Sequence, residues 1–402
     1  MTAIQTLFVR RSWTMLLVGV LVAALGAPSE ANAQVARTAV PFLQIAPDSR
    51  AAGMGNSGVA LADNANAMFW NPAGLAFQSN PQIGLTHANW LPQFNADLFY
   101  EYLVGTYQVP GIGTFGGHVT FLNLGESELR SGPGENGFEG TVRSYDVAGG
   151  VSYGVQLSDR FAFGTGVRAI YSNLSPSTTD VSSGSGFSVA FDLAALYRTA
   201  PIALGDADAT LSFGANLANM GPSITYTAAD EPLPMNLRFG TAFTIDFDEY
   251  NSLTWTGDLN KTLVNVETTR VPRLDDNGDP VLDENGDPEF DVQTDPDPFY
   301  QAIFTGWGTQ EGLINPDEQA ESLGLIEQFT MGTGLEYWYN DLFALRTGYF
   351  YENPKNGDRQ FLTFGAGLRY NIIGVDISYL YANESSPLAN TLRFSLLLSF
   401  RR

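Results

Sequence analysis

The sequence contains no cysteine and only two histidines, His87 and His118, in 402 residues. Without cysteine the chain has no disulfide, no thiolate metal ligand, no cysteine nucleophile and no cysteine to carry a lipid. Two histidines leave almost no room for a multi-histidine metal site. Basic residues are scarce too, because 20 Lys and Arg stand against 43 Asp and Glu for a net charge of −23. Proteins that bind nucleic acid present a basic surface to phosphate, so nucleic acid is excluded as a partner.

A long apolar run is missing from most of the chain. The first residues carry a basic pair at Arg10–Arg11, an apolar stretch from Met15 to Ala27 and the small-residue pattern Ala31-Asn32-Ala33. This order is typical of a secretory signal peptide, which we expect to be cleaved after Ala33. No later segment supplies the roughly 20 apolar residues that a membrane-spanning helix needs. A mature chain that crosses a membrane must therefore do so as a closed β-barrel.

From Gln82 onward, apolar and polar residues alternate with the two-residue period of a β-strand. The pattern is clear between Tyr145 and Val155 and returns between Leu392 and Phe400. The alternating segments are longer than the roughly 5–6 residues of an average soluble strand and reach the roughly 9–11 residues of a membrane strand. Aromatic residues gather near the segment ends, as they do in the girdles of outer-membrane barrels. The sequence therefore predicts an all-β, transmembrane outer-membrane β-barrel rather than a soluble sandwich.

The expected barrel has fourteen antiparallel strands, an even number that leaves both of its ends on the periplasmic side. The strands are expected near residues 82–89, 96–108, 112–124, 142–156, 160–173, 186–199, 208–220, 234–247, 251–264, 328–339, 341–352, 359–371, 373–382 and 390–401. The chain then divides into a signal peptide (1–33), an N-terminal plug or periplasmic segment (34–81) and a barrel (82–402) whose long extracellular loop spans 265–327.

The segment before the barrel lacks strand alternation but is too apolar for a free tail. It is rich in small residues and contains the run Asn71-Pro72-Ala73-Gly74, so we expect a compact plug of short helices and turns. Charges of both signs, such as Asp258, Glu336 and Arg346, lie on the expected inner face of the barrel. Because an unpaired buried charge is costly, this mixture favours paired side chains and an occluded interior over a simply water-filled lumen.

An acidic stretch from Leu274 to Pro298 contains two nearly repeated hexapeptides, each with an Asn-Gly turn signal. Its carboxylates are weak candidates for calcium ligands, because their spacing does not match an EF-hand loop. The candidate ligands are Asp275, Asp279, Asp283 and Asp287. The alternative is a solvated acidic loop, and no other metal or cofactor is expected. The following segment, Pro316–Ile326, is expected to form a short helix.

Catalysis finds little support in the sequence. A serine–histidine mechanism would need His87 or His118 beside a nucleophile, and the sequence has no G-x-S-x-G elbow. No catalytic residue is therefore assigned, and we expect a protein that is not an enzyme.

The N-terminal sequences Pro41–Gly55 and Met68–Ala73 are similar to the start of the PorV family of type IX secretion outer-membrane proteins, the PorV/PorQ family within the FadL-like barrel superfamily. The likeness continues to the end of the chain in Leu157–Phe161, Ile170–Leu174, Glu336–Asp341, Phe361–Asn371 and Pro387–Ser395. The run Asn71–Leu75 alone is shared more widely with FadL-type fatty-acid transporters.

The resemblance implies a fourteen-stranded FadL-like barrel with an N-terminal plug, placed in the outer membrane among its lipids. It implies a non-enzymatic carrier that binds the C-terminal signal domain of secreted cargo at the SprA/Sov translocon. The carrier then delivers the cargo to the surface attachment machinery, which includes the PorU sortase. The alternative is a FadL-type channel for long-chain fatty acids or other hydrophobic solutes, and a surface hydrolase is a third, weaker reading.

Overall fold

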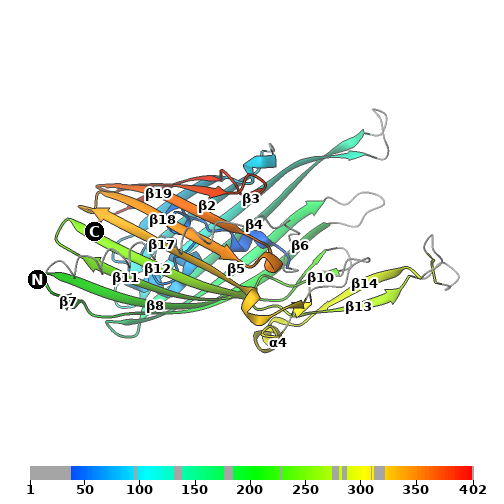
Figure 1. The fold of residues 1–402 in the computed structure, drawn as a ribbon, viewed down its shortest axis with the longest axis horizontal. Helices are drawn as coiled ribbons and strands as arrows, with labels where there is room; N and C mark the ends of the chain where they lie inside the picture. The colour runs from blue at the N-terminus through cyan, green and yellow to red at the C-terminus, as the bar shows by residue number, and fades with distance from the viewer. Residues whose placement is uncertain are drawn as a thin grey trace, which may run out of the picture.

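The computed structural model describes residues 38–94, 97–130, 138–175, 184–226, 229–273, 280–282, 288–308, 310–311 and 322–400. Within these residues the chain forms one large antiparallel sheet that closes into a barrel (Figure 1). The sheet has 15 strands, of which the short β7 (Ile202–Leu204) pairs with β8 alone. The other fourteen complete the ring, which closes where β8 pairs with β11 and where β1 pairs with β21. The expected fold class is confirmed.

The strands of the ring follow the chain in order, and the expected ranges agree with them at most ends to within a few residues. Their bounds are β1 Gln82–Asn89, β2 Phe99–Val109, β3 Gly113–Arg130, β4 Phe138–Gln156, β5 Phe161–Ser175, β6 Gly184–Arg198, β8 Ala207–Met220, β11 Asn236–Asp246, β12 Asn251–Thr262, β17 Phe329–Tyr339, β18 Phe343–Glu352, β19 Gln360–Tyr370, β20 Ile373–Ala382 and β21 Leu392–Ser399.

The wall has an apolar outer face and a polar inner face. Along β12, Trp255 and Leu259 are exposed, whereas the alternate residues Thr254, Thr256 and Asp258 are buried. Large exposed apolar residues recur around the ring, and a soluble monomer rarely exposes an apolar surface that continues so far. An outward apolar band of this kind faces lipid in outer-membrane barrels. Among the described residues, no helix is long and apolar enough to cross a membrane.

Two strands extend farther than the alternation predicts. β3 and β4 continue past the expected loop start at Gly125, and Glu126 lies opposite Arg143 beyond a bulge that follows Asn123. The two strands therefore project as a long hairpin from the end of the barrel that carries the large loops (Figure 1). The bulge interrupts the alternation here, and Gly125 within it takes a positive φ of 84°.

The chain between β12 and β17 forms the largest described insertion. It contains the hairpin of β13 (Val266–Pro272) and β14 (Phe290–Pro296), the helix α4 (Phe299–Thr305) and the 3-10 turn η5 (Leu325–Gln328). The helix expected over Pro316–Ile326 is wrong at its described end, because Ser322–Leu323 forms the short strand β16 with Gln310–Glu311, β15. The remainder of that expected helix lies outside the described residues.

Residues 38–81 lie on the inner side of the ring, where they form short helices and turns. These elements are η1 (Pro41–Gln44), α2 (Ser49–Ala52), α3 (Ala67–Trp70) and η2 (Pro72–Phe77). In Figure 1 they lie in blue between the walls of the barrel. Most of their residues are buried, and η2 packs against β4, β5 and β6. We call residues 38–78 the N-terminal segment.

Candidate functional site

The N-terminal segment is tied together by Asp48, which caps helix α2. Its carboxylate accepts a hydrogen bond of 3.0 Å from the backbone N–H of Ala51 and one of 2.7 Å from Nε1 of Trp70, at the end of α3. One side chain thus fixes the two short helices to each other. Burial raises the pKa of Asp48, although both hydrogen bonds act in the opposite direction.

The run Asn71-Pro72-Ala73-Gly74 joins the segment to the wall. Asn71 accepts from the N–H of Ala73 at 3.1 Å and so caps η2, while its amide donates to the carbonyls of Val59 and of Ala195 in β6, each at 3.0 Å. A Cβ added to Gly74 would lie 1.9 Å from the carbonyl oxygen of Ala62, so only glycine fits there. Pro72 starts η2, where its missing N–H leaves no bond unmade. The four positions therefore act as one structural unit.

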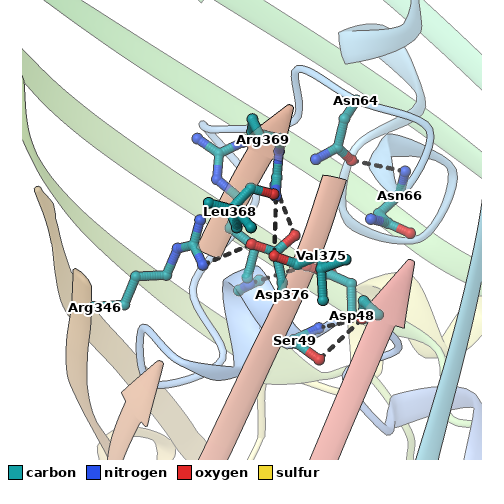
Figure 2. A network of polar contacts seen from close by, with 12 residues as sticks. Asp48, Ser49, Asn64, Asn66, Arg346, Leu368, Arg369, Val375 and Asp376 are labelled. Carbon is teal, nitrogen blue, oxygen red and sulfur yellow. Dashed lines mark hydrogen bonds and ion pairs between the residues drawn. The ribbon is translucent and has the colours of Figure 1, made fainter. Parts of the chain in front are cut away.

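A chain of ion pairs connects the segment to strands β17 to β20. Arg50 binds Glu336 through two hydrogen bonds of 2.9 and 2.7 Å, and Arg346 donates to the same carboxylate at 2.6 Å. Arg346 also donates to Asp376 at 2.8 Å, which Arg369 reaches at 2.6 Å. Figure 2 shows Arg346 and Arg369 converging on Asp376 near Asp48 and Ser49. Buried charges of opposite sign are thus paired, as burial requires.

A second set of contacts holds residues 57–59. The carboxylate of Asp258 in β12 accepts hydrogen bonds from the backbone N–H groups of Gly58 and Val59 at 2.7 and 3.0 Å. The hydroxyls of Ser57 and Thr256 lie 2.9 Å apart. Hydrogen bonds from two consecutive backbone N–H groups to one carboxylate are strong because the acceptor is charged. The inward-facing charge of Asp258 therefore holds the N-terminal segment in place.

Inward-facing glycines in several strands of the wall let the backbone of the N-terminal segment approach closely. A Cβ at Gly164 in β5 would lie 2.1 Å from the backbone nitrogen of Ala73, and one at Gly214 in β8 would lie 2.5 Å from the carbonyl oxygen of Val59. Gly348 in β18 likewise leaves room for Gly55. These glycines are not among the site residues expected from the sequence. Their signal is a glycine at an inward position of an otherwise alternating strand, which marks a close approach of another backbone.

The interior around His118 is filled. The cavity lined by Phe42, Met68, Tyr102 and His118, among other residues, has a volume of about 10 Å³. That volume holds about one water molecule. At this point the barrel has no room for a hydrophobic solute.

The two histidines lie on opposite faces of the wall. His118 is buried on the inner face beside Tyr102, with ring centroids 5.8 Å apart. His87 is on the outer face of β1, where its Nδ1 lies 3.4 Å from Glu101. The histidines therefore cannot act together in one site. Within the described ranges, no group of three or more His, Cys, Asp or Glu side chains is arranged to hold a metal.

The four weak calcium candidates lie outside the described residues. Asp275, Asp279, Asp283 and Asp287 fall within residues 274–279 and 283–287, which the structure does not describe. A calcium site there stays a prediction.

One family model matches more than half of the chain. Residues 28–269 match the family model of the type IX secretion system protein PorV. A sequence search of curated proteins finds no match. The chain is similar in structure to the toluene transporter TbuX of Ralstonia pickettii, with 14% identity, a TM-score of 0.47 and coverage of 89% of this chain and 98% of that one.

Two further solved structures are similar at the same level. The toluene transporter TodX of Pseudomonas putida has 13% identity and a TM-score of 0.41, with 88% of this chain and 97% of that chain covered. A FadL homologue of Pseudomonas aeruginosa has 12% identity and a TM-score of 0.42, with 92% and 99% covered. These likenesses concern the barrel fold, and nothing about transported solutes follows from them.

Proposed function

The chain belongs to the PorV family of type IX secretion system proteins, and from this premise we propose that it is a non-enzymatic carrier of secreted cargo. It binds the C-terminal signal domain of cargo at the SprA/Sov translocon and passes it to the attachment complex that contains the PorU sortase. The family match over residues 28–269 is the observation that carries this proposal. The barrel fold and the family place the protein in the outer membrane.

The described interior supports a carrier that works at its outer end. The N-terminal segment occupies the lumen, and its charges are used to hold it there. The hairpins β3–β4 and β13–β14 extend beyond the ring at the end with the large loops (Figure 1). We therefore place the cargo contacts on these loops, with the N-terminal segment staying inside the barrel as a plug while the protein works.

Deletion of the gene tests the proposal. Cargo proteins with the type IX C-terminal domain should accumulate in the periplasm of the mutant, and the intact gene should restore them to the surface. Affinity purification from detergent-solubilised membranes should also recover the translocon or the sortase. Normal surface display in the deletion strain would defeat the proposal.

The alternative is a FadL-type channel for long-chain fatty acids or other hydrophobic solutes. The shared run Asn71-Pro72-Ala73 favours it, but such a channel needs an apolar pocket beside the plug. The cavity next to Met68 and His118 has room for about one water molecule. Growth on long-chain fatty acids that depends on the gene, with normal cargo display, would establish the alternative instead.

A further inference from the structure

Helix α4 packs on the outside of the barrel, not over its mouth. In the strand register Lys261 of β12 lies opposite Leu237 of β11 and Phe329 of β17. Leu237 in turn lies opposite Leu217 of β8. Residues paired in this way point to the same side of a sheet. The upper outer row, as we call it, consists of Leu217, Leu237, Lys261 and Phe329.

This row continues the lipid-facing surface of the barrel. The next row toward the periplasm contains Phe239, Leu259 and Met331, all of which are exposed apolar residues on the outer face. Met331 lies opposite Tyr351 of β18, and tyrosines on the outer face mark the level of the lipid headgroups. The upper outer row therefore lies at the interface between the membrane and the extracellular water.

One face of α4 covers the upper outer row. Phe299, Ala302 and Ile303 pack with Leu217 and Leu237 in one hydrophobic cluster. Met220, Met235 and Leu263 complete it. Figure 1 shows α4 at the edge of the barrel, where the β13–β14 hairpin leaves the wall.

Lys261 fastens the end of the helix to the wall. Its side chain starts on the outer face but is only 1% exposed, and its Nζ donates to the carbonyl of Gly306 at 2.8 Å and to that of Thr262 at 2.7 Å. Gly306 is the C-cap of α4, so the ammonium group binds an otherwise open carbonyl at the negative end of the helix. A lysine facing the membrane is thereby shielded from lipid.

The opposite face of α4 is apolar, and its described side chains are exposed. Phe304 is 80% exposed, and Tyr300 and Trp307 are exposed beside it. The 3-10 turn η5 adds Ile326, which is 86% exposed. Gln328 joins the two elements by donating to the carbonyl of Gly308 at 2.9 Å.

The charge pattern separates helix α4 from the rest of the insertion. Residues 298–308 contain no charged side chain, although Asp295 and Asp297 precede them and Glu311 follows. Aromatic residues without neighbouring charges are typical of segments that lie in the membrane interface. A surface built to stay in water would expose such a face only at a cost.

We propose that the exposed face of α4 and η5 lies in the headgroup and upper acyl region of the outer leaflet, as a lipid-binding surface beside the β8–β11–β12 wall. The occupant is lipid because the surface continues the lipid-facing wall at the level of the interface. This lipid-binding surface holds the base of the β13–β14 hairpin at the membrane. This inference rests on the packing of α4 and is independent of cargo binding.

The absence of cysteine permits a direct test with single-cysteine variants. Phe304→Cys and Ile326→Cys are each labelled with an environment-sensitive dye in the full-length protein, reconstituted into phosphatidylethanolamine–phosphatidylglycerol vesicles. Leu335→Cys on the outer face of β17 is the lipid control, and Glu384→Cys in the exposed turn between β20 and β21 is the water control. Dye emission is measured with lipid-borne nitroxides and with iodide on both sides of the membrane.

The labels at 304 and 326 should be quenched by the lipid-borne nitroxide about as strongly as the label at 335. Their quenching by iodide should be severalfold weaker than at 384. Quenching by iodide as strong as at 384 would overturn the proposal, since the face would then lie in water. The proposal is also wrong if native outer membranes protect the labels from both quenchers while vesicles leave them open to iodide, because a protein partner would then cover the face.

Discussion

The N-terminal segment and the β12–β17 insertion both lie outside the ring of fourteen strands. They differ in whether their apolar and charged side chains are buried against the wall or exposed. The N-terminal segment buries its aromatics and pairs Arg50 with a wall carboxylate. The insertion leaves Phe304 and Ile326 almost fully exposed and binds the wall through one side of α4. The first region is therefore fixed to the wall by its contacts, whereas the second presents apolar side chains to whatever surrounds the barrel.

Among the variants that test this comparison, removal of the Glu336 side chain should have the largest effect on stability. Glu336→Ala leaves Arg50 and Arg346 buried without their shared carboxylate, and breaking such a pair costs about 3–5 kcal/mol. We expect a loss of that size in the free energy of unfolding, measured by urea titration in detergent micelles. Glu384→Ala, in an exposed turn, is the control and should change nothing measurable. Equal stability of the two variants would mean that the segment is not held by its charges.

A methyl group at Gly348 should have the next largest effect. Its Cβ would lie 2.2 Å from the backbone nitrogen of Gly55, whereas a Cβ at the outward Gly117 would find its nearest atom at 3.9 Å. Overpacking of this kind costs about 1–3 kcal/mol. Gly348→Ala should therefore destabilise the barrel and expose the N-terminal segment to protease. Gly117→Ala should do neither, and protection of the segment in both variants would contradict the close approach.

Asn71→Ala should cost about 1–2 kcal/mol, because it removes the cap of η2 and two further hydrogen bonds. The measurement is again the free energy of unfolding, with Asn71→Asp as the matched variant. Aspartate keeps the acceptor that caps η2 but loses the donors to Val59 and Ala195. Because its carboxylate would face the carbonyl oxygens of Val59 and Ala195 without a donor, we expect a loss at least as large as that of alanine. A clearly smaller loss would mean that the cap of η2 is the contact that matters.

Phe304→Ser should have the smallest effect on stability. The side chain is exposed from the rest of the protein, so the change opens no cavity, and the loss should stay within about 1 kcal/mol, which is the apolar contact with lipid that serine gives up. Phe42→Ser, in the buried N-terminal segment, is the matched change and should cost several times more. A large loss for Phe304→Ser would show that this residue packs against protein and would remove the contrast between the two regions.

The strand positions could be predicted because each strand alternates over its whole length and ends at turn residues. The departures have local causes. β3 and β4 run on past Gly125 through a bulge, which alternation does not reveal. Helix α4 was missed because it has only 7 residues and owes its position to tertiary contacts with Leu217 and Leu237.

The interior could be predicted only in outline. Mixed charges on the inner face indicated pairing, and the composition of residues 34–81 indicated a compact segment. The partner of each charge depends on the shear of the strands around the ring, so the link from Arg50 through Glu336 and Arg346 to Asp376 is not readable from the sequence. The inward glycines carry no charge or bulk, and their role appears only when the second backbone is in place.

The most direct test of the account locks the N-terminal segment inside the working barrel. The hydroxyl oxygens of Ser49 and Ser395 lie 2.9 Å apart, and the chain has no other cysteine to interfere with a Ser49→Cys, Ser395→Cys pair. The disulfide should form during export, and cargo reaching the cell surface is then measured with each single variant as a control. We expect full surface display with the disulfide closed. Cargo held in the periplasm by the closed disulfide and released by a reductant would contradict the claim that the segment stays in place.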